Sequence, residues 1–189
     1  KRNIYGEQLA LLYQLEIEFT DGEKRTVISD DSWKSTTGPI RMSNIYDGEI
    51  YDANYEIKGW DMPGFDDSKW KNVSTPDYTK DNIVPSVGNP VKRIEELWPI
   101  KKIRTPKNEL VFDFGQNITG RAKIRLKGNK GDTITILHAE VLDKDGNFYI
   151  DNLRSAKQKV TYIFKNNKEM VYEPYFTFQG FRYVKIEDY

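Results

Sequence analysis

The residues best suited to chemistry in this chain gather in residues 48–70, the stretch GEIYDANYEIKGWDMPGFDDSKW. Carboxylates, an amide and aromatic rings lie close together there, separated by residues that favour turns. Carboxylate and amide oxygens accept hydrogen bonds from hydroxyl groups and are ligands for Ca²⁺, and a tryptophan offers a broad apolar ring face. The stretch is therefore a candidate sugar site or metal site. The plainer alternative is an acidic loop held in place by its tryptophans.

Paired carboxylates are the catalytic option that this stretch leaves open. A glycosidase holds two of them at a fixed separation across the scissile bond. The acids are numerous enough, and they are Asp47, Glu49, Asp52, Glu56, Asp61, Asp66 and Asp67. Acids in loops are usually solvated, however, and no motif marks any pair of them as special. We therefore predict no catalytic residue in this chain.

Other familiar motifs fail because of their surroundings. His138 is the only histidine and lies in the apolar run ITILHAEVL, which is typical of a strand residue and excludes a histidine-rich metal site. No GxSxG motif supplies a nucleophilic serine. The DFG of residues 113–115 has no glycine-rich loop or HRD motif beside it, so it belongs to a strand and not to a kinase. In residues 143–147 the glycine comes too early for an EF-hand, which predicts a β-turn.

The composition argues against several classes of partner. The 189 residues carry 29 basic and 29 acidic side chains, so the chain lacks the basic excess that binds nucleic acids or anionic membranes. No apolar run approaches the roughly 18 residues of a membrane span. Residues 1–3 are not followed by the apolar stretch of a signal peptide. The absence of cysteine excludes a disulfide framework and a thiol nucleophile, but it does not fix the compartment.

The elements that must position these residues are strands. Apolar and polar residues alternate over residues 15–19 and 110–114, which is the period of a half-buried strand. An Asp-Gly pair after the first run predicts a hairpin with KRTVI, and residues 159–164 and 170–176 look like a second hairpin around KNNKE. Prolines recur over residues 72–106, where they prevent a continuous sheet or helix. We therefore predict an all-β chain of two antiparallel, jelly-roll-like β-sandwich units.

Longer motifs on both sides of the proline-rich segment carry a family resemblance. The first half contains DDSWKSTTGPI, IYDGEIYDAN and PGFDDSKW, and the second contains VFDFGQNITGRAKIRLKG, GDTITILHAEVLDKDG and YEPYFTFQGFRYVKI. In this order they resemble the N-terminal region of bacterial α-L-rhamnosidases, glycoside hydrolase family 78. The resemblance implies three segments. Residues 1–75 would be the C-terminal part of a carbohydrate-binding-like sandwich, residues 76–94 a linker and residues 95–189 a concanavalin-like sandwich.

The resemblance also implies where the chemistry of the family lies. Catalysis in these enzymes belongs to a later (α/α)6 barrel, so this chain is expected to be a non-catalytic accessory region whose partner is that barrel. The first module of some members holds L-rhamnose with Ca²⁺, which makes both of them candidate ligands here. The resemblance places Lys1 partway through the first sandwich, so we expect open strand edges and self-association. The alternative function is that of a free-standing carbohydrate-binding lectin or adhesin.

Four side chains of residues 48–70 are the candidate substrate-binding groups, and they are Glu49, Asp52, Asn54 and Trp60. In this hypothesis Trp60 stacks on a sugar ring while the polar groups bind its hydroxyls. The plainer interpretation keeps the tryptophans as packing anchors, because large aromatic side chains mostly serve packing. The resemblance assigns no Ca²⁺ ligand to any position of the chain.

Overall fold

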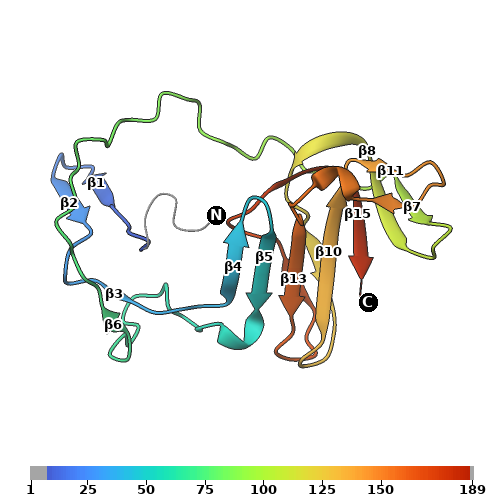
Figure 1. Cartoon of the computed structure of the whole chain (residues 1–189). Helices are drawn as coiled ribbons and strands as arrows, with labels where there is room; N and C mark the ends of the chain where they lie inside the picture. Colours follow the sequence, from blue (N-terminus) through green and yellow to red (C-terminus); the bar gives the residue numbers. More distant parts are fainter. Residues whose placement is uncertain (1–7, 188–189) are drawn as a thin grey trace. The chain divides into compact units, whose positions relative to one another are not determined.

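The computed structural model describes residues 8–187, and every regular element in this part of the chain is a β-strand or a short 3-10 helix (Figure 1). The all-β prediction is confirmed. The chain forms two compact units. The first consists of Lys1–Thr36 and Gly59–Gly88, and the second of Thr37–Lys58 and Asn89–Tyr189. Within the described residues, no helix has the length and apolar character needed to cross a membrane.

The second unit is built on a seven-stranded sheet (Figure 1). From one edge to the other its strands are β4 (Ile40–Asn44), β5 (Gly48–Asp52), β13 (Lys159–Ile163), β10 (Thr133–Ala139), β15 (Gln179–Glu187), β8 (Leu110–Gly120) and β7 (Lys101–Arg104). All neighbours are antiparallel except β5 and β13, which run parallel. The hairpin predicted for residues 159–176 is wrong, because β14 (Met170–Tyr172) pairs with β9 (Ile124–Leu126).

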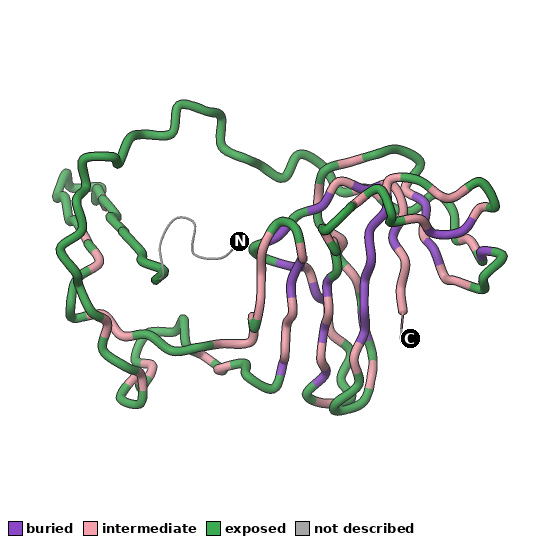
Figure 2. The backbone as a smooth tube through the Cα atoms, viewed as in Figure 1, coloured by how far each residue is buried: buried purple, intermediate pink, exposed green. Residues whose placement is uncertain are grey.

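The core of this unit lies on both faces of the central strands. β10 is rich in β-branched and apolar residues, and every residue after Thr133 is buried, as the tube in Figure 2 shows. Ile134 and Ile136 belong to the cluster that also contains side chains of β9 and β14. Leu137 and Ala139 belong to a second cluster, with Phe148 of the pair β11 (Val141–Leu142) and β12 (Phe148–Tyr149). Since alternate residues of a strand face opposite sides, the two small strand pairs cover opposite faces of the sheet.

The first unit contains little regular structure. β1 (Gln14–Glu18) and β2 (Lys24–Ile28) form the predicted hairpin, and Gly22 supplies the positive φ of +89° that its turn requires. The short strands β3 (Lys34–Ser35) and β6 (Lys71–Asn72) form the other pair. No residue of these four strands is fully buried.

The compact units are not continuous in sequence, and the break between Gly88 and Asn89 falls inside the expected linker 76–94. Residues 37–58, expected within the segment 1–75, belong to the second unit because β4 and β5 extend its sheet. The five residues of β5 each have a partner on β13, so the backbone of β5 is satisfied there. No strand lies between Asn72 and Lys101, where the prolines recur. The boundaries at 75, 76–94 and 95 stay a prediction.

Candidate functional site

Glu49 is a fully buried carboxylate at the start of β5. The Tyr172 hydroxyl donates to its Oε1 at 2.7 Å, and Ser43 Oγ donates to Oε2 at 3.2 Å. The backbone N–H groups of Tyr175 and Phe176 donate to Oε2 at 3.3 and 3.2 Å. A buried carboxylate is stable only when donors replace its water, and both oxygens have such donors here. A sugar hydroxyl would have to displace these groups to reach Glu49.

The partner of Glu49 on β14 is held in the donor state. Burial, together with the hydrogen bond to Glu49, raises the pKa of the Tyr172 phenol far above its ordinary value of 10.0. The hydroxyl therefore stays protonated and keeps donating. Its ring also packs against those of Tyr51 and Tyr162, with centroids 5.3 and 5.0 Å away. The geometry gives Glu49 a structural role, and its predicted part in sugar binding is untested.

Asp52 and Asn54 lie together where β5 passes into a 3-10 helix, η1 (Ala53–Tyr55). Asp52 Oδ1 accepts hydrogen bonds from the backbone N–H of Asn54 at 3.0 Å and from its Nδ2 at 2.8 Å. Asp52 thereby caps the helix, which is a common task of aspartate before a helical turn. The Asn54 side chain is exposed, while Ala53 is buried and anchors the turn. Of the predicted site residues, this pair is in direct contact.

A surface depression of about 300 Å³ lies beside this turn. It is lined by Glu56, Tyr162, Phe164, Lys165, Asn166, Lys168, Glu169 and Met170. Glu56 accepts a hydrogen bond from the Tyr51 hydroxyl at 3.0 Å and pairs with the Lys165 ammonium. Burial, reinforced by nearby carboxylates, raises the pKa of Tyr162 to about 12. Polar groups of both charges and two aromatic rings thus line this depression.

Trp60 belongs to the first unit, whereas the other three predicted residues belong to the second. The chain around Trp60 bends at Gly59 and Gly64, whose φ values are +76° and +80°. Trp60 is 61% exposed.

The two other tryptophans of the first unit are half-buried. Trp33 packs on Tyr13 and Trp70 on Phe65, with ring centroids 5.5 and 5.6 Å apart. These ring contacts fit the packing interpretation for Trp33 and Trp70, and the role of Trp60 stays a prediction.

Residues 8–187 contain no group of three histidine, cysteine, aspartate or glutamate side chains arranged to hold a metal ion. His138 is enclosed in the core, where its Nδ1 lies 2.8 Å from the Gln158 carbonyl oxygen. Burial lowers its pKa to about 4, so the imidazole is neutral at pH 7. The Ca²⁺ proposed from the resemblance has no assigned ligands among the described residues.

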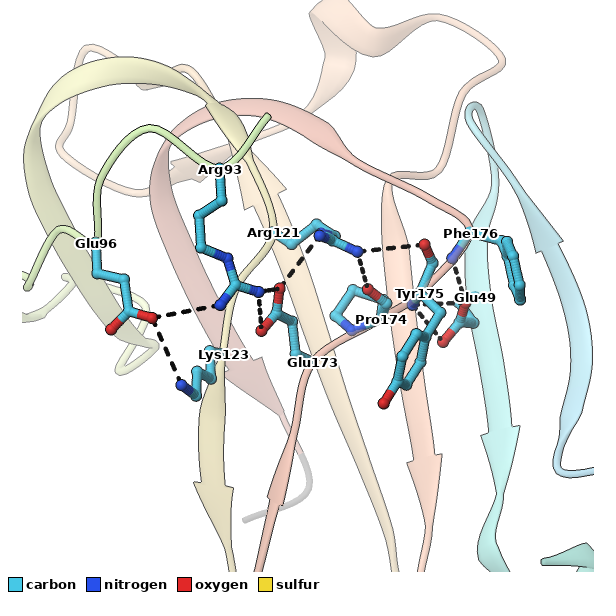
Figure 3. A network of polar contacts seen from close by, with 9 residues as sticks. All are labelled: Glu49, Arg93, Glu96, Arg121, Lys123, Glu173, Pro174, Tyr175 and Phe176. Carbon is cyan, nitrogen blue, oxygen red and sulfur yellow. Dashed lines mark hydrogen bonds and ion pairs between the residues drawn. The ribbon is translucent and has the colours of Figure 1, made fainter. Parts of the chain in front are cut away.

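A chain of polar contacts continues from Glu49 along the loop that follows β14 (Figure 3). Arg121 Nη1 donates to the carbonyl oxygens of Pro174 and Tyr175 at 3.2 and 3.3 Å. Its Nε lies 3.3 Å from Glu173, which also accepts two hydrogen bonds from Arg93 Nη2 at 2.8 and 3.0 Å. This loop is therefore held through the N–H groups of Tyr175 and Phe176, through the carbonyl oxygens of Pro174 and Tyr175, and through the side chain of Glu173.

Two further ion pairs extend this network to the segment before β7. Glu96 lies 3.5 Å from Arg93 Nη1 and 3.6 Å from Lys123 Nζ (Figure 3). Sequence reasoning did not find this network, because its bonded members are separated by up to 127 residues and no local motif links them.

Two family models match the chain in succession. The first, described as the alpha-L-rhamnosidase N-terminal domain, covers residues 1–95. The second, described as the bacterial alpha-L-rhamnosidase concanavalin-like domain, covers residues 103–189. The chain belongs to the bacterial α-L-rhamnosidase family. The resemblance inferred from the motifs of both halves is thereby confirmed.

Relatives in this family are much longer than this chain. An α-L-rhamnosidase of Streptomyces avermitilis is 45% identical over 184 residues, which are 96% of this chain and 18% of that protein. One from Alteromonas sp. strain LOR is 42% identical over 191 residues, or 100% of this chain and 21% of that protein. The solved structure of the Streptomyces avermitilis enzyme complexed with L-rhamnose is similar with a TM-score of 0.88 and 42% identity, covering 98% of this chain and 18% of that one. The chain therefore spans about a fifth of the length of these relatives.

Proposed function

We propose that this chain is a non-catalytic accessory region of an α-L-rhamnosidase whose parent enzyme hydrolyses terminal α-L-rhamnosyl residues of glycans or glycosides. The observation that carries the proposal is the match of two successive rhamnosidase family models to nearly the whole chain. About four-fifths of each relative lies outside the matched part, which leaves room there for a catalytic (α/α)6 barrel. The same observation favours this role over that of a free-standing lectin or adhesin.

The roles of the acids in the second unit support a non-catalytic region. Glu49 is enclosed by hydrogen-bond donors, Asp52 caps a helical turn and Glu56 pairs with Lys165. Glycoside hydrolysis needs two carboxyl groups facing one scissile bond, one of them free to donate a proton. These three carboxylates are instead engaged within the fold.

Activity measurements on two lengths of the protein test this proposal. The 189-residue chain should not release the chromophore from a chromogenic α-L-rhamnoside, whereas the product of the whole reading frame should. Turnover by the 189-residue chain that a single acid-to-amide substitution abolishes would overturn the proposal. A whole product without rhamnosidase activity would also contradict it.

We further infer that contact with an L-rhamnosyl group uses the turn that carries Asp52 and Asn54, and that Trp60 serves as a stacking residue in its own unit. The support is the exposure of Asn54 and Trp60 and the depression with polar walls beside the turn. Binding should be weak or absent, because a small ligand on a shallow surface gains little after ordering costs. Any binding that occurs should need Ca²⁺, as the family resemblance implies. Calorimetry with L-rhamnose, with and without a chelator, measures this. Tight binding that persists in the chelator is the contrary result.

A further inference from the structure

Five large apolar side chains of the second unit are exposed at the turn between β4 and β5 and in the loop between β14 and β15. Each exposes at least half of its surface, and they are Ile45, Tyr46, Tyr175, Phe176 and Phe178. We call this set the aromatic edge. Exposed apolar side chains are ordinary when single, but a contiguous group marks a surface that something else covers.

The two parts of the aromatic edge are joined directly. Thr177 Oγ1 donates to the carbonyl oxygen of Asn44 at 2.9 Å, which holds the loop beside the turn that carries Ile45 and Tyr46. Thr177 is buried, whereas its neighbours Phe176 and Phe178 are exposed. The rings of Tyr175 and Phe176 have centroids 6.4 Å apart. The hydrogen bond brings the loop beside the turn, and the two neighbouring rings lie on that loop.

The loop of the aromatic edge is held in a fixed conformation (Figure 3). Glu49 accepts hydrogen bonds from the N–H groups of Tyr175 and Phe176, and Arg121 donates to the carbonyl of Tyr175. Burying a carboxylate costs free energy unless hydrogen-bond donors surround it, so fixing an exposed loop through Glu49 has a high free-energy cost. A surface that is ordered before binding loses little conformational entropy when a partner covers it.

The chemistry of the aromatic edge selects a protein partner. Three of its five side chains, Ile45, Phe176 and Phe178, have no polar atom, and none of the five is charged. A sugar site needs converging polar groups, and an anionic partner needs cations at the centre. An aromatic centre with a polar rim is instead the composition of a protein interface. The rim is present, since Asp47 and Lys157 pair beside Tyr46 and Arg121 contacts the loop.

The greater length of the relatives indicates which protein partner is available to this surface. They extend over about five times the length of this chain, so a further domain is covalently available to cover the edge. A linked domain meets its docking surface at a high effective concentration, and a modest apolar patch is then sufficient. We propose that the aromatic edge is the packing surface for a domain of the same polypeptide that lies outside residues 1–189. The proposal rests on the proposed function.

Oxidative footprinting by hydroxyl radicals, read by mass spectrometry, tests this proposal. Tyr175, Phe176 and Phe178 should be oxidised readily in the 189-residue chain and several-fold more slowly in the product of the whole reading frame. The double variant Tyr175→Ser with Phe176→Ser should lower the melting temperature of the longer protein and leave that of the 189-residue chain almost unchanged. The matched control is Tyr55→Ser, an exposed tyrosine of η1, which should act equally in both.

Several outcomes would overturn the proposal. They are equal oxidation in both proteins, protection already present in the 189-residue chain, or protection of that chain by added L-rhamnose. The last would make the edge a sugar site, and the second would assign it to another part of this chain or to a second copy. Hydrolysis of a rhamnoside by a longer protein with an unprotected edge would refute this proposal and leave the proposed function standing. A reading frame that adds no residues would overturn both.

Discussion

Lowering the pH should destabilise the second unit through its single histidine. His138 is fully buried, its Nδ1 lies 2.8 Å from the Gln158 carbonyl, and Nε2 has no hydrogen-bond partner among the described residues. The carbonyl can only accept, so Nδ1 carries the proton and Nε2 is bare. Protonation would place a charge beside the ring of Phe181, whose centroid is 4.9 Å away. Burial accordingly lowers the pKa of His138 from 6.5 to about 4.

The sign and size of the effect follow from linkage. Between pH 6.5 and about 4 the unfolded chain binds a proton at His138 that the folded chain does not, so stability falls as the pH is lowered. Each unit of pKa difference corresponds to about 1.4 kcal/mol. The free energy of unfolding should therefore drop by about 2 kcal/mol between pH 7.5 and 5, and by about 3 kcal/mol below pH 4. Three carboxyls of the second unit have lowered pKa values, and Asp113, Glu109 and Asp143 add to the loss only below their ordinary values of 3.8, 4.5 and 3.8.

One histidine makes the assay unambiguous. The imidazole ¹⁵N and ¹H signals of the folded chain should stay those of a neutral ring protonated at Nδ1 down to about pH 5. Urea titrations that follow amide exchange in β10 give the stability of this unit at each pH. His138→Gln keeps a donor for Gln158 but cannot titrate, so its stability should be flat between about pH 5 and 6.5. An imidazole that titrates near 6.5 in the folded chain, or an unchanged pH slope in the variant, would refute the reasoning.

Three further substitutions test the framework of the candidate site. Glu49→Gln should lower the stability of the second unit by about 1.5–3 kcal/mol, because hydrogen bonds to a charged acceptor are lost. The control is Glu169→Gln at an exposed ion pair, which should change the stability by less than about 1 kcal/mol. Gly48→Ala should prevent β5 from pairing with β13, since a Cβ at this φ of +103° would collide with the Lys159 carbonyl oxygen. Melting followed by circular dichroism measures the effect, and the control is Gly131→Ala, where a Cβ would meet open space. Asp113→Asn weakens the pairing with Arg182 Nε at 2.8 Å that keeps the Asp113 pKa low, so about 1–2 kcal/mol should be lost at pH 7. That loss should vanish in urea titrations as the pH falls below the folded pKa of Asp113.

Local sequence patterns predicted the elements of this fold better than their partners. The Asp-Gly turn and the alternation of residues 15–19 fixed the hairpin of β1 and β2, because all of its information lies within a few residues. The parallel pairing of β5 with β13 joins Glu49 to Val160 across more than a hundred residues, and no local signal encodes it. The prediction of a hairpin over residues 159–176 was wrong for the same reason, because β13 pairs with β10 and β14 pairs with β9.

The candidate site was predicted in its residue types but not in their roles. Asp52 and Asn54 are adjacent because an Asp-Ala-Asn sequence caps a turn, which is local chemistry. Glu49 and Tyr51 are two residues apart on β5, so both side chains lie on the face of the sheet that the aromatic core covers. This two-residue spacing was the available signal that Glu49 is buried. The donors that satisfy it come from Ser43 and from residues 172–176, and only the fold brings the latter to it.

The ion pairs around Glu173 should keep the segment between β6 and β7, which contains Arg93, ordered, but they should contribute little to the stability of the fold. The Glu173 side chain is 21% exposed, and its partners Arg93 and Arg121 are 52% and 34% exposed, so each pair contributes at most about 1 kcal/mol. Glu173→Gln should therefore leave the urea midpoint of β10 exchange almost unchanged and should speed trypsin cleavage after Arg93. High salt should have the same effect on the unsubstituted chain, because it screens exposed pairs. Loss of stability comparable to that of Glu49→Gln would show instead that the network belongs to the core.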